Sequence, residues 1–301
     1  MLQHTGMMEC APAKVPITQA YIQTRAKAEQ NSANGDQNAF RQCVAPEVST
    51  DDSVSNLDIE PLNISEQKYY QSVVGTLLYV SLGTRPDISY AISVLCRYMQ
   101  SPTKIDKQAL TQLLRYIKGS LSRQLILGTN RNGIEGYSDS SYADCSKTRR
   151  STAGYVFKFN GGSISWKSQL QRTVALSTAE AEYMSLATAA QEGVFIKQLI
   201  QELHLESENS SKILLYTDNI AAKYIADCST GATTNRSKHI AIKFHYLRQL
   251  VSDGAVVINY VPTGDQPADI FTKPLSGPPC YRNADKLLGY SSENTQDMDQ
   301  T

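Results

Sequence analysis

The sequence predicts an α/β fold in which a mixed sheet flanked by helices follows a small helical segment. Two observations lead to this prediction. Across residues 67–128, apolar side chains recur every three or four positions, which is typical of amphipathic helices. Across residues 130–275, strand-like runs come first and then alternate with helical stretches, which favours a mixed sheet covered by helices.

Three helices are expected in the first of these regions. Their apolar sets lie at 70–78, 88–98 and 110–117. A turn at 84–87 separates the first two helices, and Gly119 ends the third.

The second region contains a hairpin signal. Residues 154–159 and 163–166 resemble strands, and Asn160-Gly161-Gly162 between them is typical of a tight turn. The other expected elements are a strand at 134–138, a helix at 178–203, a strand at 213–217, helices at 220–226 and 240–252, a strand at 255–261 and a last helix from about residue 266.

The two ends of the chain are more polar than its centre. Residues 1–66 are rich in Ala, Ser, Asn, Gln and Asp without a clear period, so we expect a loosely ordered N-terminal segment. Residues 276–301 are expected to form a polar tail.

Composition excludes several classes of protein. The 301 residues carry 29 Lys+Arg and 29 Asp+Glu, which argues against a uniformly basic nucleic-acid binder but allows a local basic surface. No apolar run approaches the ~20 residues that span a bilayer, and the N-terminus has no apolar signal core, so neither membrane insertion nor secretion is expected. Six widely spaced cysteines indicate free thiols in a reducing, intracellular compartment.

Acidic residues stand where expected strands end and expected helices begin. Asp139 and Asp218 each follow a strand, whereas Glu182 and Asp269 each lie near the start of a helix. Because ligands gather at the carboxyl ends of strands in open α/β sheets, one cleft could hold all four carboxylates. Such a cluster suits Mg²⁺, and two ions about 3.5–4 Å apart can cleave a phosphodiester. The alternative is that each acid only forms a turn or caps a helix.

For Glu180, capping is the better interpretation. Ser177-Thr178-Ala179-Glu180 is a capping box, in which the glutamate side chain reaches back to the amide of the cap residue. Helical geometry alone does not separate Glu180 from Glu182, but capping leaves Glu182 without a structural role.

Long segments of the chain resemble a known family. The second region contains GYSDSSYADCSKTRRSTAGYVF, SISWKSQLQRTVALSTAEAEYMSL, LLYTDNIAA, NRSKHIAIKFHYLRQLV and INYVPTGDQPADIFTKPL. These closely resemble the ribonuclease H domain of copia-type LTR-retrotransposon Pol polyproteins. Upstream, YYQSVVGTLLYVSLGTRPDISYAISVLCRYMQ resembles the segment that joins reverse transcriptase to that domain. The resemblance implies a ribonuclease H-like mixed five-stranded sheet at 130–275, a helical connection remnant at 67–128, and a chain that is the C-terminal piece of such a polyprotein.

The resemblance also implies an activity, which is hydrolysis of the RNA strand of RNA–DNA hybrids with Mg²⁺, or Mn²⁺, as cofactor. The family's acidic quartet falls on Asp139, Glu182, Asp218 and Asp269. Asp139 is expected to bridge two ions, Glu182 and Asp218 to complete one site, and Asp269 to help hold the other. Glu182 could also contact a ribose 2′-OH. The implied partners are the hybrid and the reverse transcriptase portion of a Pol polyprotein, with no membrane.

Basic residues gather in two stretches, 141–175 and 229–251, and are expected to contact backbone phosphates. For any single one of them, a solvated surface position is an equally good interpretation. The residues singled out are Arg149, Arg150, Lys167, Arg172, Arg236, Lys238 and His239. For Trp166, in the first stretch, a role in the core or the hairpin is favoured.

The sequence departs from the family at two points. The loop 263–266 lacks the histidine that related cellular ribonucleases H often carry, and Ser141 stands where copia-type proteins often have a second Asp. The chain also lacks the Tyr-x-Asp-Asp motif of a polymerase palm. The missing palm and the polar N-terminus leave an alternative, a non-catalytic retroelement remnant that acts as a nucleic-acid-binding or interaction module.

Overall fold

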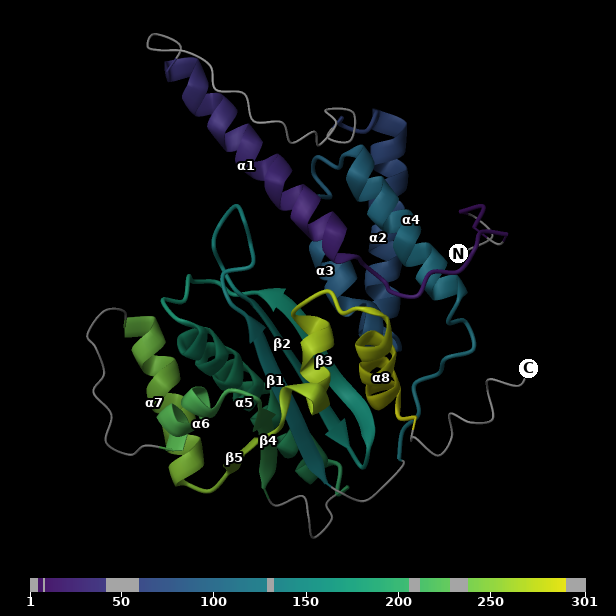
Figure 1. Cartoon of the computed structure of the whole chain (residues 1–301). Coiled ribbons are helices and arrows are strands. Elements are labelled where there is room, and N and C mark those ends of the chain that lie inside the picture. Colours follow the sequence, from purple (N-terminus) through teal and green to yellow (C-terminus); the bar gives the residue numbers. More distant parts are fainter. Residues whose placement is uncertain are drawn as a thin grey trace.

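A five-stranded sheet forms the centre of the C-terminal part of the molecule (Figure 1). The computed structural model describes residues 5–7, 9–41, 60–128, 133–205, 212–227 and 238–290. The sheet has the order β3-β2-β1-β4-β5, in which β1, β2 and β3 are antiparallel and β4 and β5 run parallel to β1. The expected mixed five-stranded sheet flanked by helices is confirmed. Its strands are β1 (Ile134–Ser141), β2 (Thr152–Phe159), β3 (Gly162–Leu170), β4 (Ile213–Thr217) and β5 (Val256–Tyr260).

The turn between β2 and β3 is the expected hairpin turn. Phe159 pairs with Gly162, so the loop has only Asn160 and Gly161 as its central residues. Their φ angles are +50° and +85°, and a turn with positive φ at both central positions matches the right-handed twist of the strands. Asn and Gly adopt this conformation more easily than other residues, which is why the sequence signal was reliable.

Helices cover both faces of the sheet. On one side lie α5 (Thr178–Glu202), α6 (Ile220–Asp227) and α7 (Lys238–Ser252); on the other lie the short 3₁₀ helix η4 (Pro267–Phe271) and α8 (Gly277–Leu288) (Figure 1). Successive residues of β2 point to opposite faces, as the pleat requires. Phe157 packs in the core shared with α5, whereas Val156 packs with Phe271 and Leu287.

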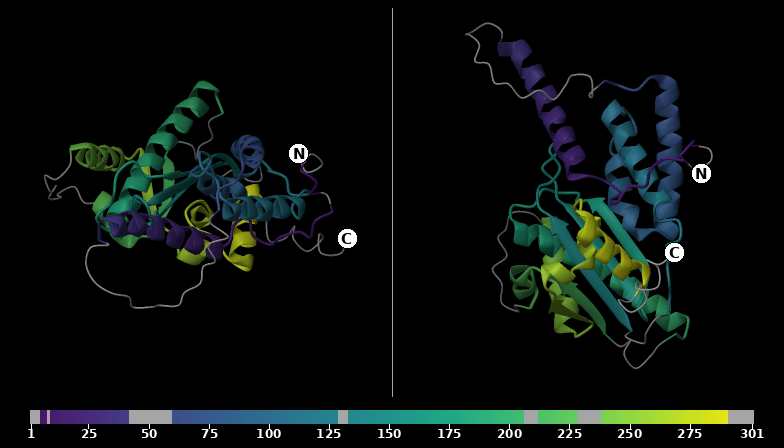
Figure 2. Two further views of the ribbon diagram at one scale, coloured as in Figure 1. Left: turned by 90° about the horizontal axis from the view of Figure 1, so that it is seen from above. Right: turned by 45° about the vertical axis from the view of Figure 1, so that its right-hand side comes forward.

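The helical segment before the sheet is also confirmed. It consists of α2 (Ile64–Gly83), the 3₁₀ turn η1 (Pro86–Ile88), α3 (Ser89–Cys96) and α4 (Lys104–Lys118). These elements share a core of their own. They lie beyond one end of the sheet, on the side where β3 and α8 lie (Figures 1 and 2). The division into domains at residues 67–128 and 130–275 stays a prediction.

The N-terminal segment differs from the expectation of loose order, because it contains helix α1 (Gln19–Arg41). Specific polar contacts hold this helix. The Tyr21 hydroxyl donates a hydrogen bond to Oδ1 of the buried Asp106 (2.8 Å), and the Arg25 guanidinium lies 4.0 Å from the centre of the Tyr98 ring. The Ser146 hydroxyl of the β1–β2 loop donates to Glu29 of α1. The prediction for 1–66 was therefore wrong for this helix, while 42–59 fall outside the described residues.

The expected polar tail is wrong for its first part, which forms α8. Cys280, Ala284 and Leu287 of this helix are buried at helical spacing. The helix also ties the two parts of the molecule together, because the Leu288 carbonyl accepts a hydrogen bond from the Ile126 amide (2.8 Å). Residues 291–301 lie outside the described part.

The last expected helix is shorter than the sequence indicated. Instead of an α-helix from residue 266, the chain forms the 3₁₀ helix η4, and Pro274 soon follows it. Of the helices in the described ranges, none combines the length and the apolar character that crossing a membrane requires.

Candidate metal centre

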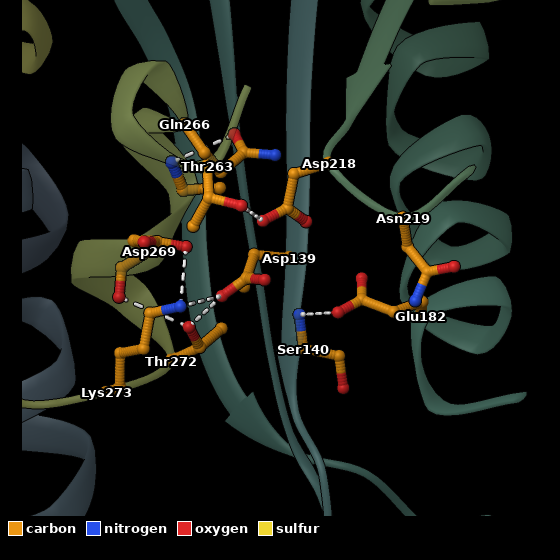
Figure 3. A network of polar contacts seen from close by, with 12 residues as sticks. Asp139, Ser140, Glu182, Asp218, Asn219, Thr263, Gln266, Asp269, Thr272 and Lys273 are labelled. Carbon is orange, nitrogen blue, oxygen red and sulfur yellow. Dashed lines mark hydrogen bonds and ion pairs between the residues drawn. The ribbon is translucent and has the colours of Figure 1, made fainter. Parts of the chain in front are cut away.

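The fold brings the four predicted acids to one edge of the sheet. Asp139 lies in the second half of β1, and Asp218 directly follows β4. Because β1 and β4 are parallel neighbours, with Tyr137 opposite Tyr216, both carboxylates emerge at the same level. Glu182 comes from the start of α5 and Asp269 from η4, on the two sides of the sheet (Figure 3).

Three of the carboxylates form a tight group. Asp139, Glu182 and Asp218 each offer one oxygen, and these oxygens all lie within 4.8 Å of one another. Asp139 is 2% exposed and Glu182 is 6% exposed, so water screens their charges poorly. Three of the four predicted acids therefore lie together, and their role as metal ligands stays a prediction.

Glu182 shows the strain of this arrangement most clearly. Its Oε1 accepts a hydrogen bond from the Ser140 amide (3.3 Å), but its buried Oε2 has no hydrogen-bond partner among the described residues. Burial, and then the charges of Asp139 and Asp218, raise the pKa of Glu182 to about 10. A buried carboxylate oxygen without a donor, close to two other carboxylates, fits a hard divalent cation, which binds oxygen ligands.

Asp269 joins the group indirectly, through Asp139. The Lys273 Nζ lies 2.9 Å from Oδ1 of Asp269 and 3.8 Å from Oδ2 of Asp139. The Thr272 hydroxyl donates a hydrogen bond to the same oxygen of Asp139. Burial and the Asp139 charge raise the pKa of Asp269 to about 7. Burial acts to lower the pKa of Lys273, but the facing carboxylates outweigh it and raise that pKa. The site therefore has two halves that share Asp139.

Neutral side chains fix the positions of these acids. The Thr263 hydroxyl donates to Oδ2 of Asp218 (2.8 Å), and the buried Gln266 donates from Nε2 to the Ser138 carbonyl (3.0 Å). Oε1 of Gln266 accepts from the Ala268 amide and so caps η4. Sequence reasoning missed Thr263, Gln266 and Lys273. Only Lys273 carried a signal, because it stands four residues after Asp269.

Glu180 takes the capping role that the sequence predicted, with one difference. The Glu180 amide donates to the Ser177 hydroxyl (3.1 Å), but the Glu180 carboxylate accepts from the Leu176 amide (2.7 Å) rather than from the amide of Ser177. Glu180 is thus engaged away from the cluster, and Glu182 is the glutamate that belongs to it.

Of the basic residues singled out, four are described with their side chains. Arg149 and Arg150 lie in the β1–β2 loop, and Arg172 lies just beyond β3. Both places adjoin the carboxyl end of β1, since Ser141 pairs with Thr152 and Thr152 with Leu170. These three residues and Lys167 of β3 are exposed. Arg236 and the side chains of Lys238 and His239 lie outside the described part, so their phosphate contacts stay predictions.

Trp166 has a structural role, as favoured from the sequence. Its indole Nε1 donates to the Ser81 carbonyl of α2 (2.8 Å), and its ring packs against the core beneath α8. This contact joins the sheet to the helical segment.

Comparison with known proteins identifies relatives over about two thirds of the chain. It is 37% identical over 205 residues to a Retrovirus-related Pol polyprotein from transposon TNT 1-94 of Nicotiana tabacum, covering 68% of this chain and 15% of that protein. It is 38% identical over 221 residues to the one from transposon RE2 of Arabidopsis thaliana, covering 73% and 15%. The chain thus spans only about a seventh of the length of these relatives.

A shorter relative matches over most of its length. The Secreted RxLR effector protein 161 of Plasmopara viticola is 44% identical over 130 residues, which are 42% of this chain and 90% of that protein. No family model matches the chain.

The solved structures similar to the chain include ribonuclease H domains, with low TM-scores. The N-terminal RNase H domain of rv2228c from Mycobacterium tuberculosis is 14% identical, covers 46% of this chain and 90% of its own, and has a TM-score of 0.32. LC11-RNase H1 in complex with an RNA/DNA hybrid is 15% identical, covers 46% and 93%, and has a TM-score of 0.32.

Proposed function

Because the chain belongs to the family of Pol polyproteins encoded by copia-type retrotransposons, we propose that it is a metal-dependent ribonuclease H that hydrolyses the RNA strand of RNA–DNA hybrids. The observation that carries this proposal is the close group of Asp139, Glu182 and Asp218, in which one buried carboxylate oxygen of Glu182 has no hydrogen-bond donor within the described part of the chain. Three carboxylates this close together repel one another, and a bound divalent cation would neutralise that repulsion.

The residues present divide the work between the two halves of the site. Glu182 and Asp218 would hold a Mg²⁺ or Mn²⁺ ion on one side of Asp139, and Asp269 would help to hold a second on the other side. When bound, such ions supply an acidified water and neutralise charge at the scissile phosphate. Thr263 and Thr272 keep Asp218 and Asp139 in position by donating hydrogen bonds to them. Glu182 would also accept a hydrogen bond from a ribose 2′-OH, the group that distinguishes RNA from DNA.

The hybrid would approach along the exposed basic residues near the carboxyl end of β1. Arg149, Arg150 and Arg172 lie at that end, and Lys167 lies farther along β3. Contacts to backbone phosphates are independent of base sequence and weaken as salt concentration rises. This arrangement suits an enzyme that must act on any hybrid.

Partner and location belong to the same proposal. The helical segment would contact the reverse transcriptase portion of a Pol polyprotein, of which this chain matches only a part. We place the activity inside the cell, in the cytoplasm or nucleus, because the described cysteines Cys10, Cys96, Cys145 and Cys280 are free thiols. Cys43 and Cys228 lie outside the described residues.

A paired substitution on α5 tests the proposal. We expect the unmodified chain to cut the RNA strand of a labelled hybrid in Mg²⁺ or Mn²⁺ and to leave a DNA duplex intact. Cleavage should stop when EDTA removes the metal ions. Glu182→Gln should lower the cleavage rate by about 10²-fold or more, because it removes a charge from the group that binds the cation.

Glu180→Gln is the matched control, since Glu180 lies two residues away on the same helix and its carboxylate accepts from the Leu176 amide, outside the cluster. It should cleave like the unmodified chain. If the unmodified chain binds the hybrid with the usual salt dependence but never cuts it, the chain is a binding module and the enzymatic proposal is wrong.

A further inference from the structure

Lys273 lies where the second half of the site would hold a cation. Its ammonium group stands between Asp269 of η4 (2.9 Å) and Asp139 of β1 (3.8 Å), two acids from different elements of the fold (Figure 3). Glu182 and Asp218, which form the other half together with Asp139, make no ion pair among the described residues. The two halves of the site are therefore charged differently.

The backbone fixes where the lysine stands. The Lys273 amide donates to the Asp269 carbonyl (3.2 Å), and Thr272, next to it, donates from its hydroxyl to Asp139. The side chain is 37% exposed, so solvent lies open to the ammonium if it leaves the carboxylates. In an ordinary surface ion pair between residues four positions apart, both side chains are exposed. Here the carboxylate side chains of Asp269 and Asp139 are only 9% and 4% exposed.

We propose that, in the chain without bound metal ions, the Lys273 ammonium occupies the position of the second divalent cation. This inference rests on the proposed function, because it assumes that Asp139 and Asp269 are metal ligands. Lys273 is then a positioning residue. It keeps Asp139 and Asp269 together without a metal ion, and its positive charge opposes entry of a divalent cation between them. Lys273 makes no ion pair with Glu182 or Asp218 and acts on them only from a distance, so its charge opposes a cation beside these two acids less, and that half binds its cation first.

Counting bound Mn²⁺ in the free chain tests this assignment without any substrate. Electron paramagnetic resonance of unbound Mn²⁺ gives the stoichiometry and the dissociation constants. We expect one Mn²⁺ per unmodified chain at concentrations where Lys273→Met binds two. The dissociation constant of the second ion should fall by about tenfold or more in this variant, because a unit positive charge has been removed from its site.

Two further variants separate charge from folding. Lys273→Arg keeps the positive charge and should bind one ion, as the unmodified chain does. Lys286→Met removes another lysine that pairs with an acid, Asp265 at 2.9 Å, outside the cluster, and should leave the isotherm unchanged. Circular dichroism of each variant confirms that it is folded before the ions are counted.

The outcomes distinguish the two proposals. One ion in the unmodified chain and two in Lys273→Met support the role of Lys273. Identical isotherms for these two chains, with one or two ions bound, overturn that role and leave the metal-dependent function standing. A failure of every folded chain to bind Mn²⁺ overturns both.

Discussion

Replacing Asp139 with asparagine is expected to lower hybrid cleavage by about 10³-fold or more, the largest loss of any single substitution in the site. The reason is that Asp139 is the only one of the four acids that belongs to both halves. It lies with Glu182 and Asp218 on one side and contacts Lys273 and Thr272 on the other. Asparagine keeps the shape of the side chain but removes its charge from both halves.

Asp253→Asn provides the control for this substitution. The same chemical change is made at an exposed residue between α7 and β5, at the opposite edge of the sheet from the carboxyl ends of the strands. Its cleavage rate in a quenched-flow or gel assay should match that of the unmodified chain. If Asp139→Asn, with an unchanged circular dichroism spectrum, retains more than a tenth of the activity, Asp139 does not hold both ions.

The second large effect concerns stability and pH in the absence of metal. Because the pKa of Glu182 is raised from 4.5 to about 10 in the folded chain, the folded state holds this proton more tightly than the unfolded state does. The resulting stabilisation is full below about pH 4.5 and is lost as the pH rises toward about 10. Each pH unit in this window lowers the free energy of unfolding by up to about 1.4 kcal/mol.

Glu182→Gln removes this titration, since glutamine resembles the protonated acid. Urea denaturation in EDTA should show that the unmodified chain loses about 2–3 kcal/mol more than the variant between pH 5 and pH 7. Other groups also titrate in this pH range, among them Asp269 with its pKa of about 7, but they do so in both chains. The comparison between the two chains cancels their shared contribution. Parallel stability curves for the two chains would show that Glu182 is not held protonated by its neighbours.

Much of the sheet and most of the site followed from local sequence signals. Asn160-Gly161 defined the hairpin because few residue pairs adopt positive φ at both central positions of a turn. Asp139 and Asp218 were found because strand ends are recognisable and parallel strands bring their ends to one edge. Glu182 was separated from Glu180 because a capping box has a fixed spacing.

The features that sequence reasoning missed depend on contacts between distant residues. Helix α1 has a polar sequence, and its hold on the molecule depends on Tyr21 and Asp106, which are 85 positions apart. Helix α8 has helical spacing of Cys280, Ala284 and Leu287, but two prolines and a polar continuation concealed it. The ammonium of Lys273 reaches Asp139 only after η4 has packed against β1, which no spacing in the sequence reveals.

The most direct test of the metal centre is anomalous diffraction from crystals of the full chain soaked in Mn²⁺. We expect an anomalous peak about 2 Å from carboxylate oxygens of Asp139, Glu182 and Asp218. Glu182→Gln crystals, soaked in the same way, should lose that peak or show it much weakened. A well-ordered cluster with no peak in the unmodified chain, at a Mn²⁺ concentration that supports binding elsewhere on the protein, would show that these acids do not form a metal centre.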